Sequence, residues 1–289
     1  MVTDMLRVTD GSGGELVADR SGDLPILWTT SDGLDGGLGV RLDKTDRIGD
    51  GAFTGVLSRP GREMTLGGLM HGTRTACRAF VRRTAALWAG KTRGLVSRDV
   101  DGLHLEARGV VLDGQIKLTP IIEDSGGRVE WEIPLYAADP YLYGHARSGQ
   151  ARSLNATVGL VYPWFDNAAG VTTGIFEYGS NGQTQVVLGN EGTAPACPVV
   201  TVEGDLPGGF RLIGSPGLLI EWPGAVTPQA PVTIDVATGS VTQLGVSQSY
   251  RLATATWAGV PPNSSGSWSL EALAGGAATL TVQLCNTYL

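Results

Sequence analysis

Histidine and carboxylate residues with spacings suited to catalysis or metal binding lie in the first half of the chain. His104 and Glu106 are two positions apart in the segment LHLEARG, so on a strand their side chains would share one face. Glu130 and Glu132 have the same spacing, which could supply paired carboxylates for general acid–base work. His104 and Glu106 have no third ligand beside them, however, and a solvated strand face explains the two glutamates better. These residues therefore predict neither a metal site nor a catalytic pair.

Other signatures of catalysis or ligand binding are weak. The loop SDGLDGGLGVRL, with Asp32 and Asp35, lacks the ligand spacing and terminal Glu of an EF-hand. Glycine clusters at 11–14 and 36–39 are not followed by a helix, so they do not predict phosphate binding. Neither a Gly-x-Ser-x-Gly elbow nor a His-Glu-x-x-His motif occurs, although a Ser-His-Asp triad can be dispersed along a chain. The histidines are scattered over the first half: His71, His104 and His145. We expect a protein that is not an enzyme and has no cofactor or metal.

Composition and charge separate the chain into two halves. Of its 289 residues 43 are Gly, which favours many turns between strands. Residues 1–150 contain 18 of the 21 Lys and Arg and 20 of the 28 Asp and Glu, so the second half is nearly uncharged. The net charge of −7 argues against a general nucleic-acid binder, which needs cations to neutralise phosphates.

Cysteine usage and hydropathy bear on location. The three cysteines have no metal-like spacing and are expected to be small buried residues of a protein that folds in a reducing cytosol: Cys77, Cys197 and Cys285. The polar N-terminus has no visible secretory signal, and no apolar run approaches the ~18 residues of a membrane helix. We therefore expect no membrane partner.

One helix is predicted in the first half. Thr73 can act as its N-cap and Gly90 lies where it would end, with an apolar stripe that includes Phe80, Leu87 and Trp88. A second face carries three arginines spaced four apart: Arg74, Arg78 and Arg82. This row is either a solvated face or a contact with an acidic surface on a neighbouring subunit.

Short strands account for the rest of the pattern. Alternating runs separated by Asp101-Gly102 and Asp113-Gly114 predict hairpins, and Val129 to Leu135 alternates with one face buried. The turn at Asp139-Pro140 ends this part of the chain. We expect an N-terminal domain over 1–144, a polar linker over 145–153 and a C-terminal domain over 154–289. The second half has no convincing helix, and its density of short strands predicts a β-sandwich.

Aromatic residues in the second half could stack on sugars. Six are considered: Trp164, Tyr178, Trp222, Tyr250, Trp257 and Trp268. Trp222 and Trp257 have apolar contexts and are expected in the core. Trp268 follows the loop PPNSSGS and is the better candidate for an exposed ring that contacts glycan.

Several segments in a fixed order resemble one family. WEIPLYAADPYLYG is followed by NEGTAPACPVVTVEG and then by VTIDVATGSV. The middle segment carries Asn190, Gly192, Pro195, Pro198 and Gly204, and the last carries Ile234, Asp235 and Gly239. In order and spacing these resemble the distal tail proteins of long-tailed, non-contractile bacteriophages, over nearly the whole chain except residues 1–30.

The resemblance implies a fold, an assembly and partners. The first half would be a tail-tube-like β domain with one helix, six copies of which close into a ring. The second half would be a galectin-like or carbohydrate-module-like β-sandwich. The ring would join the tail tube protein to the tail tip or hub proteins at the distal end of the virion tail, with DNA only passing through its bore. The alternative is a tail adhesin whose sandwich binds host glycan, and an enzyme such as a cell-wall hydrolase is the weakest hypothesis.

Overall fold

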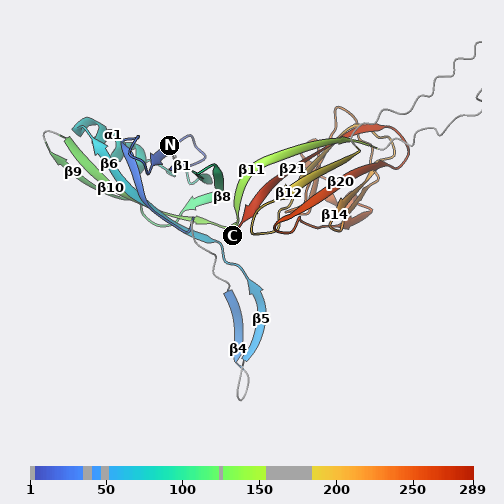
Figure 1. Ribbon diagram of the computed structural model, residues 1–289, viewed down its shortest axis with the longest axis horizontal. Coiled ribbons are helices and arrows are strands. Elements are labelled where there is room, and N and C mark those ends of the chain that lie inside the picture. Colours follow the sequence, from blue (N-terminus) through green and yellow to red (C-terminus); the bar gives the residue numbers. More distant parts are fainter. Residues whose placement is uncertain (1–3, 35–40, 47–51, 124–125, 154–183) are drawn as a thin grey trace, which may run out of the picture. The chain divides into compact units, whose positions relative to one another are not determined.

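Two compact β-rich units make up the chain. The computed structural model describes residues 4–34, 41–46, 52–123, 126–153 and 184–289. One unit comprises Met1–His145 with Tyr288–Leu289, and the other comprises Ala146–Thr287 (Figure 1). The described residues form many strands and a single α-helix, so the predicted mainly-β fold class is confirmed.

Seven strands of the first unit close into a barrel. Each pairs with the next and β8 pairs with β10, which completes the circle. All neighbours are antiparallel except β2 and β3, which meet in parallel. In order around the barrel the strands are β1 (Asp4–Thr9), β2 (Glu15–Asp19), β3 (Ile26–Asp32), β6 (Arg62–Gly72), β10 (Gly126–Ala137), β8 (Leu103–Leu112) and β7 (Gly94–Val100). Strand β9 (Lys117–Glu123) extends the wall beyond β10 as an edge strand.

Alternating apolar side chains fill the first unit. In β10 the burial alternates residue by residue, with Val129, Trp131, Ile133 and Leu135 at most 2% exposed, as the sequence predicts. The same alternation in β1 buries Leu6 and in other strands buries comparable side chains, all joined in one core. The hairpin turn between β7 and β8 places Asp101 and Gly102 at positive φ, as the Asp-Gly dipeptide predicts. The hairpin predicted at Asp113-Gly114 is wrong, because the strand that follows it, β9, pairs with β10 and not with β8.

Helix α1 (Arg74–Ala85) begins where the sequence predicts and ends earlier. The Thr73 hydroxyl accepts a hydrogen bond from the Ala76 N–H at 3.3 Å, so the N-cap is confirmed. The prediction that the helix runs to Gly90 is wrong, because its C-cap is Ala86. The backbone hydrogen bonds that follow join residues three positions apart, not four as in an α-helix. Trp88 has a φ of 59° and donates its N–H to Asp10 Oδ2 at 3.2 Å. A tertiary contact thus replaces the last helical turn.

A separate β-hairpin leaves the barrel between β3 and β6. Strands β4 (Arg41–Asp46) and β5 (Ala52–Ser58) pair with each other, and within the described chain no third strand joins them. We call this hairpin the arm. The barrel strands on either side of it pair directly, with Asp32 opposite Thr65. The arm is therefore an insertion between two strands that would be neighbours without it.

Residues 145–153 differ from the expectation of a polar linker. Strand β11 (Leu142–Arg152) runs through most of them and pairs with β8 at Tyr143 opposite Glu106. Their polar sequence reflects a strand whose middle residues are exposed, from His145 to Ser148. A polar sequence of this kind does not distinguish an exposed strand from a linker.

The second unit is a sandwich of two sheets, as predicted. Residues from both sheets fill one core, which includes Phe210, Trp222 and Val282, each fully buried. One sheet contains β18 (Val246–Ser247), β17 (Ser240–Gln243), β16 (Val232–Asp235), β13 (Val199–Asp205), β21 (Ala277–Tyr288) and β11, in that order. The other contains β12 (Gln185–Asn190), β20 (Ser264–Ala272), β14 (Phe210–Ser215), β15 (Leu218–Trp222) and β19 (Thr254–Thr256).

Two further expectations from the sequence can be compared with the structure. In the described ranges no helix is both long enough and apolar enough to span a membrane. Cys77 is buried as expected, but Cys197 is exposed and Cys285 is intermediate, so the expectation of three buried cysteines is wrong. Cys285 lies between buried residues of β21, and Cys197 lies between the buried residues Ala196 and Pro198 outside the named strands, so the local sequence does not distinguish either cysteine from the core.

Candidate functional site

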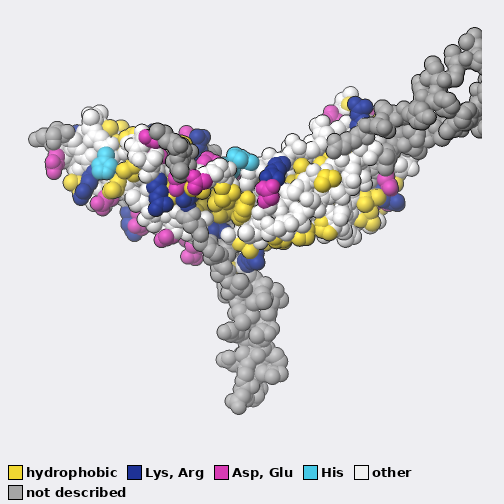
Figure 2. All heavy atoms as spheres, viewed as in Figure 1, with side chains coloured by type: hydrophobic (Ala, Val, Ile, Leu, Met, Phe, Trp, Pro, Cys, Tyr) yellow, Lys and Arg dark blue, Asp and Glu magenta, His cyan; other side chains and the backbone are white. Residues whose placement is uncertain are grey.

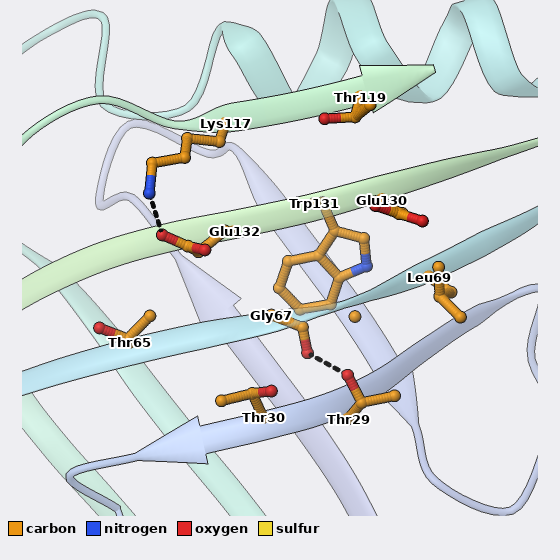
Figure 3. A pocket seen from close by; sticks show the side chains of 11 residues that line it. Thr29, Thr30, Thr65, Gly67, Leu69, Lys117, Thr119, Glu130, Trp131 and Glu132 are labelled. Atoms are coloured by element: carbon orange, nitrogen blue, oxygen red, sulfur yellow. Dashed lines mark hydrogen bonds and ion pairs between the residues drawn. The ribbon is translucent and has the colours of Figure 1, made fainter. Parts of the chain in front are cut away.

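A shallow groove of about 400 Å³ lies on the outer face of the barrel wall (Figure 3). Its floor contains Gly67 and Gly68 of β6, which have no side chains to fill it. Gly68 is required there because a Cβ would lie 2.0 Å from the Leu27 carbonyl oxygen. The other lining residues come from β3, β6, β9 and β10: Thr29, Thr30, Thr65, Leu69, Lys117, Thr119, Glu130, Trp131 and Glu132.

The groove contains polar groups but no catalytic pair. Lys117 Nζ lies 2.6 Å from Glu132 Oε1 across the β9–β10 pair (Figure 3). Both side chains are substantially exposed, at 68% and 43%, so this ion pair stabilises little. Glu130 and Glu132 share the outer face as predicted, but the ion pair neutralises Glu132. Threonine hydroxyls and this ion pair give the groove a polar lining.

The arginine row of α1 lies on the exposed face of the helix. Arg74, Arg78 and Arg82 are all exposed, whereas Cys77 and Phe80 are buried. The predicted division of the helix into a core face and a cationic face is therefore confirmed. The contact of this row with a neighbouring subunit stays a prediction.

Trp268 does not lie where the sequence predicts. Its side chain is 1% exposed in the sandwich core, so the expectation of an exposed ring is wrong. Strand β20 buries Gly266, Trp268 and Leu270 and turns the serines between them outward. This period-two pattern in SSGSWSL was the signal that sequence reasoning missed. A buried indole offers no face to a sugar.

The other aromatic residues are divided between core and surface. Trp222 is fully buried as expected, and Trp257 is partly buried against the same core. Tyr250 is 82% exposed. Trp164 and Tyr178 lie outside the described residues, as do the second glycine cluster at 36–39 and Asp35 of the acidic loop.

The Asp-Pro-Tyr turn is held by side chains from distant positions. Asp139 accepts hydrogen bonds from the Tyr141 N–H at 3.1 Å and from the Tyr143 hydroxyl at 2.6 Å. The Pro140 carbonyl accepts from Arg62 Nε at 2.9 Å, and Arg62 also donates to the Gly33 carbonyl. Arg62 is only 1% exposed. This motif therefore has a structural role: it joins the base of the arm to the start of β11.

Asn190, from the middle segment of the family resemblance, also has a structural role. Its Nδ2 donates to the carbonyls of Ala194, Val260 and Pro261 at 2.8–3.2 Å, and its Oδ1 accepts from the Gly192 N–H at 3.0 Å. A Cβ on Gly192 would lie 2.0 Å from the Thr287 carbonyl oxygen, so only glycine fits.

A cluster of imidazoles and carboxylates lies on β7, β8 and β11. His104 Nδ1 is 2.7 Å from Asp99 Oδ1, and the His104 and His145 rings are stacked with their centroids 4.2 Å apart. His104 Nε2 lies 3.7 Å from Glu106 Oε2. The fold thus adds His145 and Asp99 to the His104–Glu106 pair that the sequence offered.

The elements described above define a class of fold, a closed β-barrel with one helix and an inserted arm, followed by a β-sandwich. Among solved structures, the Dit protein of phage SPP1 has this fold, and it is described as a paradigm of the hub adsorption apparatus in phages that infect Gram-positive bacteria. The superposition has a TM-score of 0.58 at 13% identity and covers 98% of this chain and 99% of that one. The mainly-β, Dit-like fold that the sequence resemblance implied is confirmed.

Two baseplate structures are more distantly similar. Chains of the phage P2 baseplate in its activated conformation with Ca and of the phage p2 baseplate with Sr give TM-scores of 0.47 and 0.45. Their identities are 11% and 12%, over 94% and 92% of this chain and 98% and 97% of theirs. No family model matches the chain, and no curated protein matches it.

Proposed function

We propose that this chain is a structural hub subunit of a long-tailed, non-contractile phage, and that six copies close into a ring between the tail tube and the tail tip. The observation that carries the proposal is the likeness to the SPP1 hub protein, which extends over 98% of the chain and includes both units.

The arm supports assembly with other copies. An isolated two-stranded hairpin is marginally stable in water, and it usually needs further strands or a packing surface. Within the described chain β4 and β5 have only each other. A second copy supplies the missing surface in a heterologous contact. Such a contact closes into a ring when the rotation from one copy to the next is a whole fraction of a full turn.

Edge strand β9 and the arginine row offer further contact surface. Strand β9 pairs only with β10 among the described strands and carries Ile121, which is 41% exposed. The exposed arginines of α1 are cations in a chain with a net charge of −7, so an acidic patch on the next copy is a suitable partner. On the face seen in Figure 2, charged side chains are dense over the first unit. We place the ring contacts in that unit.

The excess of negative charge also fits passage of DNA. Residues 1–150, which include the ring-forming unit, contain 18 cations and 20 anions, a net charge of −2 per chain. Six copies therefore repel a polyanion weakly if the bore shares this excess, and DNA passes without binding. A retarded DNA band on addition of assembled rings would contradict this part of the proposal.

The mass of the purified chain tests the ring. Mass photometry over a range of concentrations is expected to show six chains of 30.1 kDa, about 180 kDa, and electron micrographs are expected to show six-fold rings. A chain that stays monomeric at every concentration, alone and with its tail tube and tip proteins, overturns the proposal.

An arm-deletion variant tests the contact. Because Arg62 contacts the Gly33 carbonyl and Asp32 pairs with Thr65, the two ends of the arm lie close together. Residues 36–58 can therefore be replaced by four Gly and Ser residues at little entropic cost. We expect a folded barrel with unchanged thermal unfolding but no rings; rings that persist would remove the arm from the interface while leaving the hub role intact.

The residue on which the adhesin alternative depends, Trp268, is not accessible to a glycan. This alternative rested on an exposed Trp268, and that side chain is buried. No other described contact favours sugar binding by the sandwich, so we do not advance that function.

A further inference from the structure

Three neighbouring strands of the first unit bring two imidazoles and two carboxylates onto one surface. Asp99 of β7 is directly opposite His104 of β8. Tyr143 of β11 is opposite Glu106, and His145, two residues further along β11, lies with its ring centroid 4.2 Å from that of His104. Asp99, His104 and His145 each offer a ligand atom, and these atoms all lie within 4.8 Å of one another. Side chains directly opposite on paired strands are close enough to share a ligand.

Asp99 orients the His104 ring. Its Oδ1 lies 2.7 Å from His104 Nδ1, and a carboxylate at this distance accepts the Nδ1 proton, which leaves the Nε2 lone pair available. A carboxylate that holds one nitrogen of an imidazole while the other binds metal is the usual outer contact of a histidine ligand. The His104 side chain is only 15% exposed, so its ring orientation is constrained.

His104 Nε2 and Glu106 Oε2 are separated by a distance that suits a metal ion. They lie 3.7 Å apart, beyond a good hydrogen bond. Two ligands held at about 2.0–2.2 Å from a zinc ion in tetrahedral geometry are roughly 3.4 Å apart. Glu106 Oε1 accepts a hydrogen bond from Arg108 Nε at 2.6 Å, and the Arg108 guanidinium also lies over the Tyr143 ring. The cluster contains two carboxylates, of Asp99 and Glu106, and one guanidinium, of Arg108, so its net charge favours the binding of a cation.

His145 completes the set after a rotation of its ring. Its ring is stacked on His104 with an interplanar angle of 12°. Imidazole binds metal in the plane of the ring, so parallel rings do not converge on one ion. His145 is exposed, and rotation about its side-chain torsions can direct a nitrogen to the ion without displacing the core.

We propose that this cluster binds a divalent transition-metal ion of the zinc class. His104 Nε2, His145 and Glu106 Oε2 are the ligands, and Asp99 is the positioning residue that holds His104. Two imidazoles with one carboxylate favour Zn²⁺, Co²⁺, Ni²⁺ or Cu²⁺ over Ca²⁺ and Mg²⁺, which prefer oxygen ligands alone. The ion fixes strand β11 to β8 of the barrel.

Calorimetric titration with Zn²⁺, on full-length chain without a histidine tag, tests the site. We expect saturable binding of one ion per chain. Co²⁺ is expected to give visible absorption bands of a four-coordinate complex. His104→Gln and His145→Gln are each expected to weaken Zn²⁺ binding at least about 10-fold. Asp99→Asn is expected to weaken Zn²⁺ binding by about 10- to 100-fold. His71→Gln, on β6 outside the cluster, is the matched control and should bind like the original chain.

Two outcomes overturn the proposal. One is the absence of saturable Zn²⁺ binding below millimolar concentration; the other is binding that persists in the His104→Gln/His145→Gln double variant. The thermal unfolding of every variant is measured without metal, so that a loss of folding is separated from a loss of the ligand. Because the test needs no ring, its result is independent of the proposed hub role.

Discussion

At the scale of single residues, a few buried polar side chains hold together segments that are distant in sequence. Arg62 joins Gly33 to Pro140, and Asn190 joins its own turn to the loop before β20. Asp10 accepts the N–H groups of Ser12 and Gly14 at 2.8 Å and that of Trp88 at 3.2 Å. Buried polar groups that lose their partners destabilise more than the bond itself contributes, so these positions should be sensitive to substitution.

Arg62→Met is expected to lower the free energy of unfolding of the first unit by about 2–4 kcal/mol. The substitution leaves the Pro140 and Gly33 carbonyls without their charged donor, and hydrogen bonds to charged groups contribute about 1.5–3 kcal/mol each. Burial lowers the pKa of Arg62, the charge of Asp139 opposes that shift, and the guanidinium remains protonated at neutral pH. Urea unfolding, followed by hydrogen exchange in barrel peptides, measures the change.

Arg78→Met is the matched control for this prediction. Arg78 is exposed on α1, so the same chemical change there should alter stability by less than about 0.5 kcal/mol. Equal effects of the two substitutions would show that Arg62 does not act as a buried link.

Asp10 makes the stability of the first unit depend on pH. Burial alone would raise the pKa of Asp10, but hydrogen bonds from Ser12, Gly14 and Trp88 outweigh it and hold the pKa below its ordinary value. A carboxyl whose pKa is lower in the folded chain stabilises it above the unfolded pKa of about 3.9, and the effect is lost as pH falls through the folded value.

Asp10→Asn is therefore expected to destabilise the first unit most at neutral pH. The difference from the original chain should shrink as pH falls below about 4, because the carboxyl of the original chain is then protonated as well. Unfolding curves between pH 3 and 7 measure it. A difference that stays constant with pH would assign the effect to shape instead of charge.

At the scale of elements, the sequence correctly predicted features that depend only on neighbouring residues. The alternation of β10, the Asp101-Gly102 turn and the Thr73 cap follow from neighbouring residues, and all three are confirmed. The end of α1 was not predictable in this way, because Asp10, 78 positions earlier, captures the Trp88 N–H. Leu87 and Trp88 are buried as the apolar stripe indicates, but outside the helix.

Pairing between distant strands was beyond the reach of sequence reasoning. Closure of the barrel depends on three residue pairs between β8 and β10, and the β11–β8 pairing brings His145 beside His104. In both cases other strands intervene along the chain, because β9 lies between β8 and β10, and β9 and β10 lie between β8 and β11. The position of His145 beside His104 was therefore not predictable from local spacing.

Thr73→Ala is expected to destabilise the first unit by about 1 kcal/mol. The substitution removes the acceptor for the Ala76 N–H at the start of α1, and loss of such a cap commonly costs about 0.5–2 kcal/mol. Thr73→Ser keeps the hydroxyl and should cost much less. The comparison of both variants by urea unfolding checks the cap, and equal costs would mean that the methyl group matters instead.

At the scale of the whole molecule, the chain is one unit inserted into another. Residues Ala146–Thr287 form the sandwich, and the chain then returns to the barrel unit with Tyr288–Leu289. Tyr288 packs against the barrel core beside residues from the first half of the chain. The concentration of charge before residue 151 thus follows the division into units closely, with the charged unit carrying the arm, the arginine row and the groove.

Tyr288→Ala is expected to destabilise the first unit and leave the second unchanged. Full burial of a large apolar side chain contributes roughly 1.5–3 kcal/mol, and Tyr288 is partly buried, so a loss of about 1–2 kcal/mol is expected. Hydrogen exchange measured by mass spectrometry resolves the two units.

Tyr250→Ala is the control for Tyr288→Ala. Tyr250 is 82% exposed in the second unit and should change neither unit. Faster exchange in sandwich peptides of the Tyr288 variant would show that Tyr288 stabilises that unit instead.

The insertion sets an order of events on the ribosome. The residues that cover one part of the barrel core emerge only after the 142 residues of Ala146–Thr287. At about 5–20 residues per second, that delay is roughly 7–28 s. During this interval the nascent barrel exposes apolar surface, whereas the sandwich can reach its native state almost as soon as its own last strand is made. The unit translated first is thus the one completed last.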